Sequence, residues 1–342
     1  MNAGILTGGG DCPGLNAVIR AVVKRGGQLG HTFVGIKDGW KGLIDNSLVE
    51  LTKDAISGLL PRGGTILGTS RTNPFKKEGD LEKTLAGIKR LSLDCLVCIG
   101  GDDTLGVAAK LFDMGIATVG VPKTIDNDLS STDFTFGFDT AVTIVTEALD
   151  RLHTTTEAHH RVMVVEVMGR HAGWIAVYGG LAGGADMILI PEEPFDVEEV
   201  AKVVRKRKGE GKNFSIIVAA EGAYPKEVGG VITKEKVLDA FGHVKLGGVG
   251  EFLAGEIEKR TGVETRYVVL GHLQRGGSPT AYDRVLATRY GVKAAELMHE
   301  KKFGRMAALQ GNKIVDVPLK EAAGKAKTVD MEIYRIASVF FG

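Results

Sequence analysis

Residues 122–128 (PKTIDND) place a cation, a hydroxyl, an amide and two carboxylates within one short segment. Asp126 and Asp128 would repel each other in a purely structural loop, and each would prefer solvent. In an active site, however, one carboxylate can hold a metal or accept a proton while the other orients it. The segment therefore predicts a catalytic loop. An Asx-type turn that satisfies its own backbone is the structural alternative.

The elements that must position this loop alternate between strands and helices. The apolar run 116–121 predicts a buried strand that ends at Pro122, because proline has no N–H to donate to a ladder. A strand at 3–7, a glycine loop at 8–14 and a helix at 15–25 form half of a βαβ unit, whose helix N-terminus offers free N–H groups to an anion.

The same alternation continues along the chain. Further strands are predicted at 94–99, 162–167, 181–190, 214–220 and 267–270, and further helices at 81–91, near 104 and at 139–152. These patterns predict an α/β fold with two similar three-layer domains and mostly parallel sheets. The polar glycine loops fall at carboxyl ends of strands, where open parallel sheets bind ligands.

Composition narrows the possible functions. The chain has 342 residues, and about 150 residues per domain suggests two domains. Its net charge of +1 gives no bulk attraction to nucleic acid or to a membrane surface. Cys12, Cys95 and Cys98 are too few for a disulfide framework and suggest core thiols in a reducing compartment. No apolar run approaches the about 18 residues that span a bilayer, so we expect a cytoplasmic protein.

The strand-end loops share a chemistry of carboxylates, cations, glycines and hydroxyls. The carboxylates are Asp102, Asp103, Asp126 and Asp128, and the cations are Arg71, Lys123, Arg161, Arg170, Arg266 and Arg275. This set suits phosphoryl transfer, in which a metal bridges phosphates, cations stabilise the phosphoryl oxygens and a carboxylate accepts the hydroxyl proton.

Each loop also has a structural interpretation when it is taken alone. The loop 8–14 fits neither the Walker nor the dinucleotide pattern and is compatible with a tight turn. Arg71 is compatible with a solvated loop residue, and the acids at 102–103 with a helix cap. The basic run 205–208 favours a solvated helix end over a nucleic-acid patch, because no aromatic residues are interleaved with it.

Taken together, five loops resemble those of the phosphofructokinases. They lie at 9–16 (GGDCPGLN), 100–104 (GGDDT), 122–128 (PKTIDND), 168–170 (MGR) and 271–277 (GHLQRGG). They occur in order and with compatible spacing from Gly4 to about Arg305. The pyrophosphate-dependent branch of the family is the more similar one. In that branch an acid, here Asp103, follows the metal-binding Asp, here Asp102, and a lysine, here Lys123, precedes Thr-Ile-Asp.

The resemblance implies roles for individual residues. Asp126 would take the proton from the 1-hydroxyl of fructose 6-phosphate, with Asp103, Lys123, Thr124 and Arg170 as further catalytic groups. Asp102, helped by Asp128, would hold magnesium (Mg2+). Gly10, Arg71 and Thr104 would bind the phosphoryl donor. Besides Thr124, Asp126 and Arg170, the substrate-binding groups would be Ile125, Arg161, Met168, Gly169, Glu221, Arg266, His272, Leu273, Gln274 and Arg275.

The donor, the assembly and the domains follow from the same resemblance. We expect pyrophosphate as donor, with ATP as the alternative and a non-catalytic sugar-phosphate or nucleotide sensor as a remote one. In the family, Arg161 and Arg266 would come from a neighbouring subunit, which implies a homotetramer or homodimer with composite active sites. The domains would comprise residues 1–138 plus about 278–300, and 139–275 plus the C-terminal tail, with the active site between them.

Overall fold

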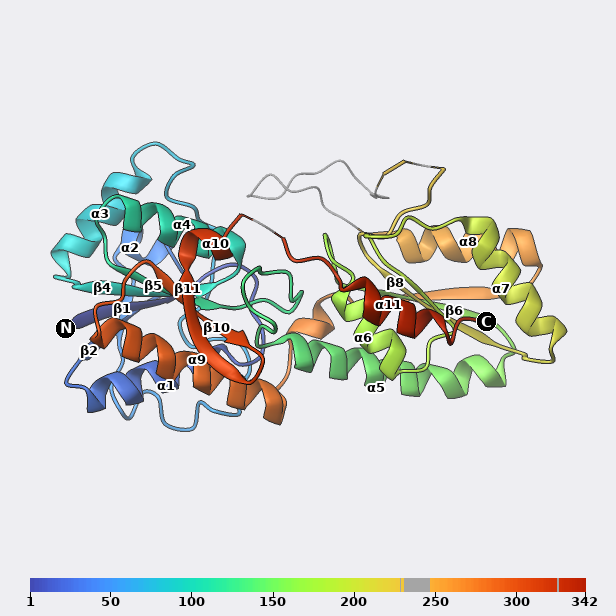
Figure 1. Ribbon diagram of the computed structural model, residues 1–342, viewed down its shortest axis with the longest axis horizontal. Coiled ribbons are helices and arrows are strands. Elements are labelled where there is room, and N and C mark those ends of the chain that lie inside the picture. The colour runs from blue at the N-terminus through green and yellow to red at the C-terminus, as the bar shows by residue number, and fades with distance from the viewer. Residues whose placement is uncertain (228, 231–246, 325) are drawn as a thin grey trace. The chain divides into compact units, whose positions relative to one another are not determined.

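The computed structural model describes residues 1–227, 229–230, 247–324 and 326–342, which form two compact units (Figure 1). The first unit comprises Met1–Ile125, Leu129–Thr140 and Arg275–Lys325. The second unit comprises Asp126–Asp128, Ala141–Gln274 and Ala326–Gly342. The predicted α/β class with mostly parallel sheets is confirmed.

The first unit is built on a seven-stranded sheet with the order β11-β10-β5-β4-β1-β2-β3. Its strands are β1 (Asn2–Thr7), β2 (Thr32–Ile36), β3 (Leu48–Glu50), β4 (Cys95–Gly100), β5 (Thr118–Pro122), β10 (Arg305–Gln310) and β11 (Lys313–Pro318). The five central strands are parallel, and the strands at the two edges pair antiparallel. Parallel pairing brings the carboxyl ends of β1, β4 and β5 to one edge of the sheet.

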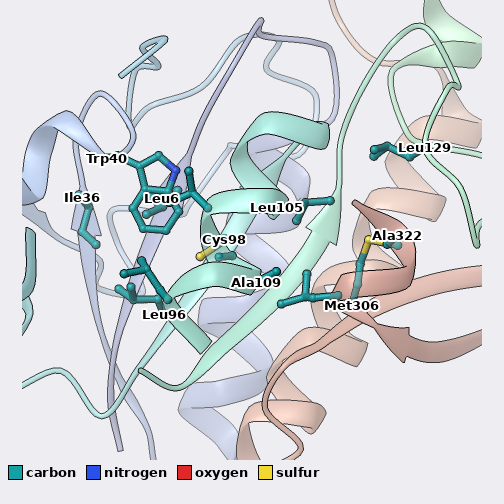
Figure 2. Packing of buried hydrophobic residues seen from close by; sticks show 14 of the residues in the cluster. Leu6, Ile36, Trp40, Leu96, Cys98, Leu105, Ala109, Leu129, Met306 and Ala322 are labelled. Atoms are coloured by element: carbon teal, nitrogen blue, oxygen red, sulfur yellow. The ribbon is translucent and has the colours of Figure 1, made fainter. Parts of the chain in front are cut away.

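Helices cover both faces of this sheet. They are α1 (Leu15–Gln28), α2 (Lys41–Asp45), α3 (Asp80–Arg90), α4 (Asp102–Asp113), α9 (Ala281–His299) and α10 (Leu319–Ala322). In Figure 1, α1 and α9 lie on one face, and α3, α4 and α10 lie on the other. Buried apolar side chains fill the space under the second group, with Leu6, Leu96 and Cys98 of the sheet meeting Leu105 of α4 (Figure 2). Burial of this cluster fixes the strand ends that carry the polar loops.

The second unit has a four-stranded parallel sheet with the order β7-β8-β6-β9. Its strands are β6 (Val162–Val167), β7 (Met187–Leu189), β8 (Ser215–Ala220) and β9 (Thr265–Val269). Its helices are α5 (Phe138–Ala158), which starts in the first unit, α6 (Trp174–Ala182), α7 (Val197–Gly209), α8 (Val249–Thr261) and α11 (Met331–Ser338). Helices α7 and α8 cover one face of the sheet, and α5, α6 and α11 cover the other (Figure 1).

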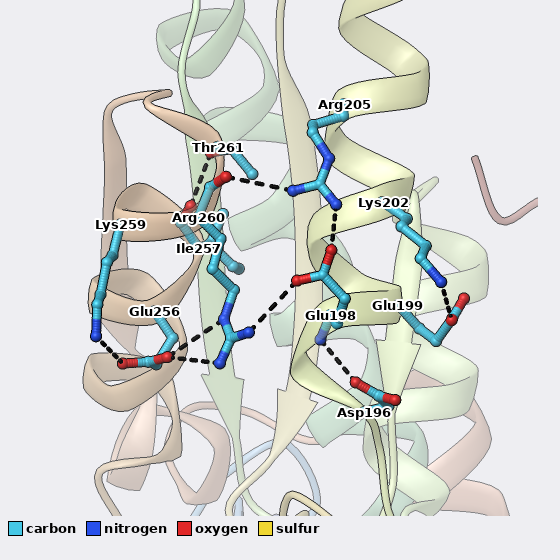
Figure 3. Close-up of polar contacts among 10 residues, drawn as sticks. All are labelled: Asp196, Glu198, Glu199, Lys202, Arg205, Glu256, Ile257, Lys259, Arg260 and Thr261. Carbon is cyan, nitrogen blue, oxygen red and sulfur yellow. Dashed lines mark hydrogen bonds and ion pairs between the residues drawn. The ribbon is translucent and has the colours of Figure 1, made fainter.

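The basic run 205–208 lies in the C-terminal part of α7, with Lys206, Arg207 and Lys208 in its last turn. Arg205 donates a hydrogen bond to Glu198, and Glu198 also accepts one from Arg260 Nη1 of α8 at 3.4 Å (Figure 3). Exposed pairs of this kind contribute little to stability. Arg205, Lys206 and Lys208 are exposed and form the solvated helix end that the sequence predicts, whereas the Arg207 side chain is only 11% exposed and pairs with Asp186 at 2.9 Å.

Several boundaries differ from the sequence prediction, each for an identifiable reason. Helix α1 continues through Gly26 and Gly27 to Gln28, because glycine leaves room for the ring of Phe33, which a Cβ on Gly26 would approach to 2.2 Å. The predicted strand at 181–190 is wrong in its first half. Helix α6 extends to Ala182, and only Met187–Leu189 pair in the sheet.

The C-terminal tail also differs from the prediction. The sequence assigns the whole tail to the second domain, but β10 and β11 extend the sheet of the first unit. The register of β10 on β5 joins Arg305 to Val119 and Met306 to Gly120. Only Ala326–Gly342, which includes α11, belongs to the second unit.

Candidate active site

Three loops that the sequence predicts to carry chemistry follow adjacent strands of the first unit. The register pairs Thr7 of β1 with Ile99 of β4, and Gly100 of β4 with Pro122 of β5. The three strands therefore end at one level, and the loops that begin at Gly8, Gly101 and Lys123 start side by side. This edge is where parallel sheets bind ligands.

Lys123 and Arg275 converge on the glycine loop after β1. The Lys123 side chain is only 3% exposed, and its ammonium donates a hydrogen bond to the carbonyl oxygen of Gly10. Arg275 Nη1 donates to the carbonyl oxygen of Asp11 at 3.2 Å. A Cβ on Gly10 would lie 2.5 Å from that Nη1 atom. The absence of a side chain at Gly10 is thus what allows the guanidinium of Arg275 to approach this backbone.

The carboxylates after β4 lie in the first turn of α4, where the helix dipole favours negative charge. Asp102 and Asp103 are exposed, whereas Thr104 is buried and packs against Gly8, whose Cβ would lie 2.5 Å from Thr104 Oγ1. Asp102 Oδ1 accepts a hydrogen bond from the backbone N–H of Gly324. The helix-cap interpretation is wrong in detail, because the N-cap residue is Gly101 and neither acid caps α4 with its side chain, although both still benefit from the helix dipole.

The carboxylates at the start of α4 are ligands of a kind that suits magnesium. Within the described residues no group of three His, Cys, Asp or Glu side chains could hold a metal ion. Mg2+ does not require such a group, because it is commonly held by one or two carboxylates together with substrate phosphates and water. The exposed Asp102 carboxylate meets that requirement.

The loop that carries Arg71 lies beside the first glycine loop. Gly9 donates its N–H to the carbonyl of Ser70 at 3.2 Å, and Thr69 Oγ1 donates to the carbonyl of Gly9. Arg71 itself is exposed. The segment that carries Arg71 is therefore hydrogen-bonded to the glycine loop that Lys123 also contacts.

In the loop after β5, the chain passes from one unit to the other. Ile125 is fully buried, and the carbonyl of Thr124 accepts a hydrogen bond from Thr135 Oγ1 at 2.7 Å. Asp126 and Asp128 are half-buried and belong to the second unit. Asn127 between them is fully buried and has a φ of 52°, in the left-handed region.

Within the second unit, the loops after β6, β8 and β9 are tied to one another. Gln274, which is fully buried, accepts the N–H of Met168 at 3.2 Å and donates to the carbonyl of Gly271 at 3.0 Å. Gly169 has a φ of 138°, which favours glycine. Its carbonyl accepts the N–H of Gly222, directly after Glu221.

These bonds gather the residues that the sequence analysis assigns to the sugar. Met168, Gly169 and Arg170 follow β6, Glu221 follows β8, and the short helix η1 (Gly271–Arg275) follows β9. His272 and Leu273 of η1 are exposed, and Arg170 is half-buried.

Arg161 and Arg266 lie elsewhere. Arg161 directly precedes β6, and Arg266 is the second residue of β9, so both lie toward the amino ends of the strands whose carboxyl ends carry Met168 and His272. Glu264 Oε1 joins them, at 3.5 Å from Arg161 Nη1 and 3.0 Å from Arg266 Nη2. A six-residue strand spans about 20 Å. The second unit of one chain does not bring these arginines to the loops around Met168.

No motif in the sequence pointed to two residues that contact the predicted loops. Lys327 Nζ donates to Asn127 Oδ1 at 3.2 Å, and Glu192 accepts the N–H groups of Gly173 and Val329. Lys327 lies in the tail, for which the sequence analysis found no resemblance. Only the folded chain shows that the tail returns to the catalytic loop.

The cysteines are buried free thiols, as predicted. Burial raises the pKa of Cys12 and of Cys95 to about 12 each, and it raises the pKa of Cys98 still further. Thiols of this kind are inert at neutral pH.

Comparison with known proteins identifies the family of the chain. The phosphofructokinase family model matches residues 2–298. The chain belongs to the phosphofructokinase family. A pyrophosphate--fructose 6-phosphate 1-phosphotransferase from Streptomyces coelicolor is 57% identical over the whole of both chains. An ATP-dependent 6-phosphofructokinase from Mycobacterium tuberculosis is 52% identical, also over the whole of both chains.

A solved structure supports the family at the level of the fold. The phosphofructokinase of Pichia pastoris in the T-state matches with a TM-score of 0.83 and 31% identity. That match covers 99% of this chain and 36% of the yeast chain. In the part of the chain that the structure describes, none of the helices combines the length and the hydrophobicity that a membrane span requires.

Proposed function

We propose that the chain catalyses the reversible, Mg2+-dependent transfer of a phosphoryl group from pyrophosphate to the 1-hydroxyl of fructose 6-phosphate. The products are fructose 1,6-bisphosphate and phosphate. The observation that carries this proposal is the convergence of Lys123 and Arg275 on the backbone of Gly10 and Asp11, beside the carboxylates that begin α4. A buried lysine on a glycine loop next to exposed acids suits a bound polyphosphate with its metal, and the half-buried Arg275 beside it suits the phosphate of the sugar.

Asp126 is the proposed base. It removes the proton of the 1-hydroxyl as that oxygen attacks the transferred phosphorus, and the bond to the leaving phosphate breaks. Thr124 and Arg170 contact the transferred phosphoryl group. Asp102, helped by Asp128, would hold Mg2+, which would supply positive charge to the phosphate oxygens when bound. Gly10, Arg71 and Thr104 contribute to the donor site.

The sugar site is proposed for the loops of the second unit. Met168, Gly169 and Glu221 line the sugar, with Ile125, Leu273 and Gln274 beside the substrate. The 6-phosphate is held by His272, Arg275, Arg161 and Arg266, because a dianion suits guanidinium forks. The amino-end position of Arg161 and Arg266 supports a site completed by a second copy of the chain. The proposed assembly is therefore a homodimer or homotetramer with composite sites.

Pyrophosphate is proposed as the donor because of Asp103. A carboxylate there would lie where the α-phosphate of ATP must pass, and pyrophosphate has no such group. The relative from Streptomyces coelicolor carries the pyrophosphate-dependent name, which supports the same choice.

ATP is the second candidate donor, and the 52% identity to the enzyme of Mycobacterium tuberculosis supports it. A coupled assay of fructose 1,6-bisphosphate formation, with pyrophosphate and ATP at equal concentrations, separates the two. We expect turnover with pyrophosphate and little with ATP. Preference for ATP would overturn the donor assignment and leave the sugar site intact.

A further inference from the structure

The C-terminal segment Ala326–Val329 runs against the catalytic loop of the same unit. The N–H of Lys327 donates to the carbonyl of Asp128 at 2.7 Å. The ammonium of Lys327 donates to Asn127 Oδ1 at 3.2 Å. Main chain and side chain of one residue thus hold two consecutive residues of the loop that carries Asp126.

Asn127 occupies a position where support matters. It is fully buried and has a φ of 52°, a left-handed conformation that is uncommon for residues with a side chain and that asparagine tolerates better than most. Its conformation determines the directions in which the neighbouring carboxylates of Asp126 and Asp128 leave the backbone. A charged donor makes a stronger hydrogen bond to a buried amide oxygen than a neutral donor does.

Lys327 is itself fixed from the side of the sugar loop. Its carbonyl accepts the indole N–H of Trp174 at 3.1 Å, and its ammonium lies 5.1 Å from the centre of the Trp174 ring. Trp174 is the first residue of α6, directly after Gly173.

Glu192 provides a second connection. One of its oxygens accepts the N–H of Val329 at 2.8 Å, and both accept the N–H of Gly173 at 3.1 Å. The tail is therefore bonded both to the segment that follows Met168–Arg170 and to the segment that contains Asp126.

We propose that Lys327 is a positioning residue for phosphoryl transfer, acting on Asp126 and Asp128 through Asn127. The inference rests on the proposed function. Lys327 lies beyond residues 2–298, which the family model matches. Displacing a catalytic group by about 1 Å can cost on the order of 10²-fold in rate. Loss of the ammonium should therefore lower turnover more than it weakens sugar binding.

The test compares three substitutions in the full chain. Lys327→Met keeps the length of the side chain and removes the charge, and Lys327→Arg restores a charged donor. Lys320→Met is the matched control, because Lys320 also lies in the C-terminal region and is ion-paired, with Asp113 at 2.8 Å, but does not contact the loop. The kcat and the KM for fructose 6-phosphate are measured with saturating donor, and thermal unfolding checks each fold.

We expect Lys327→Met to lower kcat at least tenfold while KM changes less than threefold. Lys327→Arg should recover most of kcat, and Lys320→Met should behave as the wild type. If Lys327→Met does not fold, Lys327→Gln replaces it, with the same expected pattern. An unchanged kcat, a raised KM at unchanged kcat, or an arginine variant as slow as the methionine variant would overturn the inference.

The turnover of the wild type distinguishes a failure of this inference from a failure of the proposed function. No turnover with either donor would overturn the proposed function, and the inference with it. Wild-type turnover that Lys327→Met leaves unchanged would overturn the inference alone.

Discussion

The ammonium of Lys123 donates a hydrogen bond to the backbone carbonyl of Gly10, although the two residues follow different strands. Lys123 is 3% exposed, so its charge acts in a medium of low effective dielectric, where electrostatic interactions are strong. A neutral carbonyl satisfies one of its three N–H groups. The cation is thereby held at the glycine loop, in the position where we propose that the phosphates of the donor bind.

Replacing Lys123 with Met should lower turnover with pyrophosphate by about 10²-fold, the usual effect of removing one group that stabilises developing charge. The KM for fructose 6-phosphate should change little, because Met168, Gly169, Glu221 and His272 of the proposed sugar site belong to the second unit, whereas Lys123 belongs to the first. Steady-state kinetics with pyrophosphate measures both. If turnover stays near normal while thermal stability falls, Lys123 only supports the fold.

Replacing Asp103 with Gly should admit measurable activity with ATP. Two negative charges about 4 Å apart repel by roughly 4 kcal/mol at an effective dielectric of about 20, and half of that value disfavours ATP more than tenfold. Asp103 is exposed in the first turn of α4, so its removal should leave the fold intact. The ratio of kcat/KM for ATP to that for pyrophosphate should rise at least tenfold. An unchanged ratio would show that donor choice depends on another residue.

Replacing Asp126 with Asn should lower kcat by at least about 10²-fold, because general base catalysis typically contributes 10²–10⁴-fold. Asn has nearly the same shape, and Asp126 is half-buried, so the fold should be retained. Binding of fructose 6-phosphate, measured by calorimetry, should persist. A variant with near-normal turnover would reject Asp126 as the base.

The strand-end loops were predictable because their pattern is local. An apolar run followed by glycine and polar residues identified the loops after β1, β4 and β5. The register that aligns Thr7, Ile99, Gly100 and Pro122 then places these loops at one edge. The end of α1 was not predictable, because Gly26 and Gly27 usually stop a helix. Here the ring of Phe33, from the following strand, packs against Gly26.

The position of the C-terminal tail could not be predicted from the sequence. The strands β10 and β11 carry ordinary strand patterns, but only pairing with β5 shows to which sheet they belong. Lys327 is one of 43 basic residues, and its spacing from Asn127 exceeds any local motif. Contacts between residues so far apart in the sequence depend on how the folded elements pack, which no local pattern encodes.

The buried carboxyl of Asp283 should make the stability of the fold depend on pH. It is fully buried at the start of α9, and its Oδ2 accepts the N–H of Thr140 at 2.8 Å and its hydroxyl at 2.6 Å. Burial raises the pKa of this carboxyl from 3.8 to about 6, against the opposing effect of those hydrogen bonds. Between about pH 4 and pH 6 the folded chain therefore binds more protons than the unfolded chain.

It follows that this group stabilises the fold more as the pH falls from about 6 to about 4, by on the order of 3 kcal/mol over the whole range. Asp283→Asn does not titrate and should lack this contribution. The difference in thermal stability between wild type and variant, measured from pH 7 to pH 4.5, should shift in favour of the wild type at low pH. A difference that is independent of pH would contradict the raised pKa.

Mixing two inactive variants tests whether the sugar-phosphate site is composite. Arg266 is 59% exposed and lies toward the amino end of β9, and Glu264 pairs it with Arg161. Arg266→Ala removes one guanidinium from the proposed 6-phosphate site, and Asp126→Asn removes the base. If Arg266 acts in a neighbouring subunit, a hybrid oligomer contains some sites in which both residues are intact.

Mixing the two variants under conditions that exchange subunits should therefore restore activity, although neither variant is active alone. For a dimer with random exchange, about half of the molecules are hybrids, and each hybrid has one intact site out of two. The mixture should then approach about a quarter of wild-type activity per chain. Subunit exchange is verified with differently tagged variants. No recovery after verified exchange would mean that each site is built within one chain, or that Arg266 has no part in it.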